Sequence, residues 1–135
     1  MRLIVAGGMV AASLLSGLAQ ADDLHSLDLD ALDKAEVADF LGKWQIRNEA
    51  GDKSCDVVLK REMTIGGMQI DVDPACAKAF PIMDEIAAWR LKEGWAIDLV
   101  DAVRQMRLRF TVPDVSYVAV QDADGIFTIE QLPKH

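Results

Sequence analysis

The sequence predicts an all-β protein: an eight-stranded antiparallel up-and-down β-barrel preceded by a flexible leader and a short N-terminal helix. Three observations predict this fold. Eight short segments alternate apolar and polar residues, closely spaced turns separate these segments, and two cysteines stand within the series. Alternation with a period of two is typical of antiparallel sheets that have one buried face. Eight such strands can close into a barrel, with a two-sheet sandwich as the alternative.

The first 21 residues have the layout of a cleavable secretory signal. Arg2 precedes an uncharged apolar run over residues 3–18, and Ala19 and Ala21 supply the small side chains that a signal peptidase reads. The run is shorter than the roughly 20 residues of a membrane span, so we expect no membrane anchor. Cleavage is expected after Ala21, with Ala19 as the alternative, and the mature protein is expected in the periplasm or outside the cell.

The segment after the signal is acidic at first and then helical. Residues 22–33 mix leucine and aspartate without a clean period, which indicates an irregular leader. Residues 34–41 place Val37 and Phe40 on one helical face, with Asp33 as the N-cap and Gly42 as the stop. The expected organisation is therefore signal peptide 1–21, N-terminal arm and short helix 22–41, and β-barrel domain 42–135.

The remaining chain supplies the eight strands. They are expected at residues 44–47, 55–60, 68–73, 89–92, 95–99, 105–110, 116–120 and 126–132. One longer interruption, residues 74–86, contains a short helical turn at 75–80. In the last strand Phe127 and Ile129 are expected on the same face. The large side chains expected to fill the interior are Trp44, Trp89, Trp95, Met106 and Phe110.

Cys55 and Cys76 are the only cysteines, and an even pair in an exported protein indicates a disulfide. Zinc binding by this pair would need two further ligands, but His25 and His135 lie near the two ends of the chain. A disulfide closing this loop should stabilise the fold by about 3 kcal/mol.

Composition and motifs exclude several classes of function. The formal net charge of −8 argues against nucleic-acid binding, which needs a basic surface. His25 lies in the leader and His135 is the last residue of the sequence, so neither lies on a predicted strand and a catalytic triad has no base. The sequence contains no Gly-rich phosphate loop and no His-Glu-x-x-His motif. These observations predict a monomeric binding protein, not an enzyme, without cofactor or metal of its own.

An ordered set of residues then suggests a family. The set comprises Gly42-Lys43-Trp44, Cys55, Cys76, Ala88-Trp89-Arg90, Gly94, Ile97-Asp98-Leu99, Phe110 and Tyr117. It spans residues 37–132 and resembles the bacterial alkaline metalloprotease inhibitors, a family that also includes related outer-membrane lipoproteins. The resemblance implies an eight-stranded barrel with one disulfide, located in the periplasm, that inhibits a secreted serralysin-type zinc metalloprotease.

The resemblance also implies a mechanism, in which the mature N-terminal segment enters the active cleft and its α-amine approaches the catalytic zinc. On this chain the inhibitory arm would comprise Asp22, Asp23, Leu24, His25 and Ser26. The chain departs from the family in three ways. Its leader is longer, two aspartates begin the arm, and the turn after Asp101 lacks the expected glycine.

Two other binding functions remain open. A small-ligand carrier would use the mouth of the barrel and would need a cavity, which the large interior side chains argue against. An envelope protein that binds lysozyme would use the acidic surface. Neither alternative requires a protease target.

Overall fold

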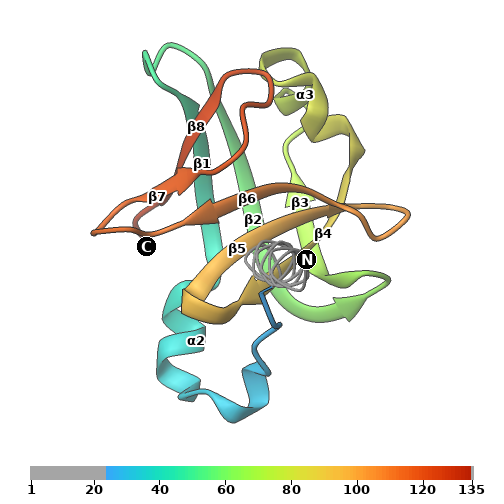
Figure 1. Cartoon of the computed structure of the whole chain (residues 1–135), viewed down its shortest axis with the longest axis vertical. Helices are drawn as coiled ribbons and strands as arrows, with labels where there is room; N and C mark the ends of the chain where they lie inside the picture. Colours follow the sequence, from blue (N-terminus) through green and yellow to red (C-terminus); the bar gives the residue numbers. More distant parts are fainter. Residues whose placement is uncertain (1–23, 135) are drawn as a thin grey trace, which may run out of the picture.

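A computed structural model describes residues 24–134 and contains a closed barrel whose strands are hydrogen-bonded in the order β1 to β8 (Figure 1). The strands are β1 (Gly42–Asn48), β2 (Ser54–Thr64), β3 (Gly67–Val72), β4 (Ile86–Lys92), β5 (Ala96–Asp101), β6 (Met106–Thr111), β7 (Tyr117–Ala119) and β8 (Ile126–Gln131). Every neighbouring pair is antiparallel, and β8 closes the barrel on β1 through the pair Ile46↔Ile129. The predicted fold class is confirmed, and the sandwich alternative is excluded.

Within residues 24–134, five helical segments accompany the strands. They are η2 (Leu29–Ala31), α2 (Lys34–Phe40), α3 (Cys76–Ala79), η3 (Pro81–Glu85) and η4 (Glu93–Trp95). The predicted N-cap of α2 is confirmed, because the Asp33 side chain accepts hydrogen bonds from the N–H groups of Ala35 and Glu36. Gly42 follows the helix with φ +118°, a conformation that glycine adopts readily, and so lets the chain turn directly into β1.

The barrel interior is filled by side chains. Trp89, Phe80, Phe110 and Ile46 are all fully buried in one hydrophobic cluster. In Figure 1, α2 lies at one end of the barrel and α3 at the other. The disulfide Cys55–Cys76 joins β2 to α3 and confirms the predicted pairing.

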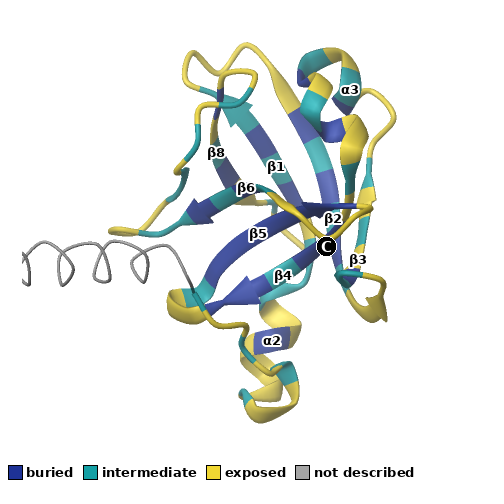
Figure 2. Ribbon diagram, turned by 45° about the vertical axis from the view of Figure 1, so that its right-hand side comes forward, coloured by how far each residue is buried: buried dark blue, intermediate teal, exposed yellow. Residues whose placement is uncertain are grey.

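Strand β5 is buried along its whole length (Figure 2). Alternate residues such as Ile97 and Leu99 belong to the interior cluster. On the other face the carboxylate of Asp98 accepts two hydrogen bonds from the guanidinium of Arg109, at 2.7 and 2.8 Å. This two-point contact satisfies a carboxylate that is only 1% exposed.

Two β-bulges overturn predictions about the core. Leu99 pairs with Leu108 and Val100 with Met106, so one residue of β6 has no partner, and Met106 is 36% exposed instead of interior. A second register shift skips Phe127, which is 40% exposed while Ile129 is buried. An extra residue in one strand breaks the period-two relation between its neighbours, which explains both errors.

Trp95 also departs from the prediction, because it lies in the turn η4 before β5 begins and not in a strand. Its φ is +61° and its side chain is half-buried. Glu93-Gly94 was expected to provide the turn, and the turn extends one residue further. Among residues 24–134, no helix is long and apolar enough to span a membrane.

Candidate functional site

The histidine and cysteines of the described residues do not form part of a metal-binding cluster. Within residues 24–134, no three His, Cys, Asp or Glu side chains gather in a way that could hold a metal ion. His25 is exposed, His135 lies outside the described residues, and both cysteines are in the disulfide. The candidate site is therefore a binding element.

The buried charged residues have structural partners. They are Asp98, Asp101 and Lys92. Asp101 accepts hydrogen bonds from the backbone N–H groups of Gln105 and Val103, and the first of these chiefly holds the pKa of its carboxyl below the usual 3.8. Arg104, within this turn, has φ +68°, so it occupies the left-handed conformation for which a glycine was expected.

Lys92 leads to the candidate site, because the only hydrogen bond that its side chain makes among the described residues is to the leader. Its Nζ donates to Ser26 Oγ at 3.1 Å, and Lys92 is 8% exposed. Ser26 and Lys92 form an isolated antiparallel β-bridge. The leader therefore pairs with the end of β4.

Backbone hydrogen bonds flank this bridge on both sides. The N–H of Leu27 donates to the carbonyl of Leu91 at 2.8 Å, and the N–H of Glu93 donates to the carbonyl of His25 at 2.9 Å. The N–H of His25 in turn donates to Glu93 Oε1 at 2.9 Å. Residues 25–27 thus behave as a very short extra strand. The part of the predicted flexible leader that the structure describes lies against the barrel.

The end of β4 can accept this extra strand because β3 does not reach it. The pairing of β3 with β4 is centred on Met68↔Trp89, and β3 begins only one residue earlier, at Gly67. At Gly67 the two strands approach so closely that a Cβ would lie 2.4 Å from the carbonyl oxygen of Trp89. Beyond the hairpin, β4 continues to Lys92, and the leader occupies the edge that β3 leaves open.

The turn after β4, residues 93–95, forms a fixed rim beneath the leader. Gly94 and Trp95 both have positive φ, +73° and +61°. The hydroxyl of Tyr117 donates to the carbonyl of Trp95 at 2.6 Å, and burial raises the pKa of Tyr117 to about 12. The phenol therefore stays protonated and able to donate at any physiological pH.

An aromatic cluster supports this rim from the α2 end of the barrel. The ring of Phe40 lies 4.9 Å from Trp44, 5.3 Å from Trp95 and 6.3 Å from Tyr117, measured between centroids. Trp44 Nε1 also donates to the carbonyl of Phe40 at 2.9 Å, which attaches the helix to β1. Edge-to-face and tilted aromatic pairs at these distances add to the stabilisation by burial.

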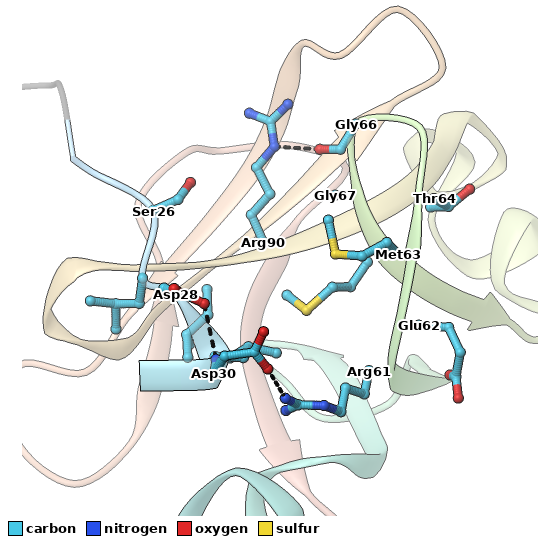
Figure 3. Close-up of a pocket in the computed structure, with 14 residues that line it drawn as sticks. Ser26, Asp28, Asp30, Arg61, Glu62, Met63, Thr64, Gly66, Gly67 and Arg90 are labelled. Carbon is cyan, nitrogen blue, oxygen red and sulfur yellow. Dashed lines mark hydrogen bonds and ion pairs between the residues drawn. The ribbon is translucent and has the colours of Figure 1, made fainter. Parts of the chain in front are cut away.

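On its other side the leader borders an open groove of about 770 Å³. Figure 3 shows the leader residues Ser26, Asp28 and Asp30 on one wall of the groove and the end of β2, from Arg61, on the opposite wall. An ion pair between Arg61 and Asp30 crosses it. The leader is thus hydrogen-bonded to β4 on one side, and on the other side an ion pair across the groove links it to β2.

The predicted arm divides into two parts. Asp22 and Asp23 lie outside the described residues, as does the predicted signal peptide. Leu24 is half-buried at the rim, whereas His25 and Ser26 are exposed but hydrogen-bonded to the end of β4. Sequence reasoning missed Lys92 and Glu93, because polar residues that end a predicted strand are indistinguishable from an ordinary solvated turn.

Comparison with known proteins gives one family. A family model described as protease inhibitor Inh matches residues 34–127, from the first turn of α2 into β8. None of the curated proteins compared with the chain matches it. The matched segment covers more than half of the chain and contains β1 to β7, the start of β8, the disulfide and the rim. Residues 25–27 of the leader lie before the matched segment.

Proposed function

This chain belongs to the protease inhibitor Inh family, and from that premise we propose that it inhibits a secreted serralysin-type zinc metalloprotease. The family is one of inhibitors and not of enzymes, so its partner is a protease. The family match over residues 34–127 is the observation that carries this proposal. In the proposed complex the mature N-terminal arm occupies the active cleft and the barrel serves as a rigid scaffold.

The chemistry of a zinc protease supports an arm of this kind. Catalytic zinc keeps one coordination position open for water or substrate, and a neutral amine is a suitable ligand for that position. After cleavage behind Ala21, the free α-amine would belong to Asp22. The two aspartates that begin the arm would bring negative charge close to a divalent cation, where a carboxylate is favoured.

The barrel supports the proposal because it presents the leader from a rigid body. The closed sheet and the Cys55–Cys76 disulfide limit motion of the scaffold. Binding then requires only a few arm residues to become ordered, which reduces the entropy lost on association. The disulfide is consistent with an extracytoplasmic location, and we propose the periplasm as the resting compartment.

Titration of a purified serralysin-type protease with the mature protein tests the proposal. We expect stoichiometric loss of activity, and loss of that inhibition when residues 22–24 are deleted. The deletion stops short of His25, so the contacts with β4 and the melting temperature should be preserved. Equal potency after the deletion would contradict insertion of the arm, and full protease activity with excess intact protein would contradict the protease target.

The alternative functions make different predictions. A small-ligand carrier needs an interior cavity, whereas the described interior is occupied by Trp89, Phe80 and Phe110, all fully buried. A lysozyme-binding protein driven by acidic charge would lose binding steeply as salt increases. Inhibition of lysozyme with that salt dependence, and none of the protease, would favour the envelope-protein alternative.

A further inference from the structure

We propose that residues 25–27 and the end of β4 form an anchor that fixes the point from which the inhibitory arm leaves the barrel, with Lys92 and Glu93 as positioning residues. The inference rests on the proposed function, because a positioning role requires an arm that binds. The anchor also reduces the number of residues that can enter the protease. His25 and Ser26 contact the barrel, so the residues that reach the protease are those before His25.

The contacts that carry the inference occur within three leader residues. Two backbone hydrogen bonds, Leu27 to Leu91 and Glu93 to His25, have the geometry of antiparallel strands. Side chains add one contact at each flank: Lys92 Nζ with Ser26 Oγ, and Glu93 Oε1 with the N–H of His25. The Lys92 contact is partly shielded from water, since Lys92 is only 8% exposed although Ser26 is exposed.

The turn η4, which contacts the leader, is itself held in place. Glu93 begins the turn η4, whose positive φ values at Gly94 and Trp95 are maintained by the Tyr117 hydrogen bond and by the packing of Trp95 on Phe40. Backbone held in uncommon conformations by its surroundings is frequent at functional sites. A site is positioned well when the residues around it fix the residues that contact the ligand. The rim is fixed by its surroundings in this way, and it in turn fixes the leader.

The groove beside the leader makes the β4 contacts decisive for its position. Figure 3 shows open space between the leader and Met63 and Thr64 of the β2–β3 hairpin. Across this gap the leader is held by the exposed ion pair of Asp30 with Arg61, and exposed ion pairs contribute little. The leucines of residues 27–32 also pack against the core, but apolar burial is non-directional, so the hydrogen bonds to β4 set the register at which the chain emerges.

An anchor at His25 limits the reach of the arm. Three extended residues ahead of it span at most about 10 Å, so the distance between barrel and protease surface must suit that length. Added length ahead of the anchor would displace the arm terminus from its place in the cleft. Added length behind the anchor would leave the terminus where it is.

A pair of insertions tests this difference. One variant of the mature protein carries a glycine between Leu24 and His25, and its matched control carries a glycine between Leu32 and Asp33. We expect the first to raise the inhibition constant about tenfold or more, because displacements near 1 Å can have effects of that size or larger. We expect the control to change it less than about twofold, because that insertion lies behind the anchor and leaves the hydrogen bonds of residues 25–27 to β4 in place.

A double-mutant cycle of Ser26→Ala and Lys92→Met tests the side-chain contact. Each single change should weaken inhibition about fivefold, the effect of one hydrogen bond, and the double variant should be no weaker than either single variant. Lys53→Met makes the same charge change in the turn between β1 and β2, and it should leave inhibition unchanged.

Amide hydrogen exchange measures the anchor without any protease. The N–H groups of Leu27 and Glu93 should be protected in the free protein, and the Leu24–His25 insertion should preserve that protection. Unprotected amides, or equal loss of potency from the two insertions, would overturn the anchor. Absence of inhibition by the unmodified protein would instead overturn the proposed function, and the exchange result would still show whether the leader is docked.

Discussion

Loss of the Cys55–Cys76 disulfide is expected to lower the free energy of unfolding by about 3 kcal/mol. The two cysteines are 21 residues apart in sequence. Closing a loop of that length removes roughly 11 cal/mol/K of entropy from the unfolded chain, which is about 3 kcal/mol at 25 °C. For a domain of this size that difference lowers the melting temperature by about 10–15 °C.

Thermal unfolding with and without dithiothreitol measures this contribution. Trp44 and Trp89 are 3% and 0% exposed, so their fluorescence reports the loss of the core. The control is a variant with both Cys55→Ala and Cys76→Ala, whose melting temperature should not respond to the reductant. A wild-type protein shown by mass spectrometry to be reduced, yet melting within about 2 °C of the oxidised form, would refute the reasoning.

Three further perturbations have directions fixed by the structure. Asp98→Ala leaves the guanidinium of Arg109 without its two-point contact and should destabilise the protein by about 3 kcal/mol in urea unfolding, whereas less than about 0.5 kcal/mol would contradict it. The hydrogen bond from Gln105 lowers the pKa of Asp101 in the folded state, so its stabilisation is present above about pH 4 and is lost as the pH falls through the folded pKa. Stability measured from pH 6 to 2 should therefore fall more steeply for the wild type than for Asp101→Asn, and parallel curves would argue against this role. Gly67→Ala places a methyl group 2.4 Å from the Trp89 carbonyl oxygen and should destabilise the barrel by about 2 kcal/mol, which an unchanged urea midpoint would disprove.

Much of the barrel could be predicted because local patterns determine it. Apolar alternation marks each strand, and Asp33 and Gly42 mark the two ends of α2. The errors occurred where non-local pairing overrides the pattern. Met106 and Phe127 are exposed because bulges shift the register beside them, and a bulge depends on the partner strand as much as on its own sequence.

The anchor could not have been predicted from the leader sequence. Its two backbone hydrogen bonds involve no particular side chain, and the partner strand lies 66 residues away, from Ser26 to Lys92. The same holds for β2, which extends to Thr64 although the alternation of its apolar residues ends near Leu59. In both cases the geometry of a neighbouring strand, and not the local pattern, decides the structure.

The leader also covers the open end of strand β4. Trimming the chain past Leu27 would expose an unpaired carbonyl at Leu91 and an unpaired N–H at Glu93, on a strand end that nothing else in the described part of the chain covers. Bare strand ends of this kind are templates for pairing with another molecule. The segment that we propose to position the arm thus also covers an edge at which a second molecule would otherwise pair.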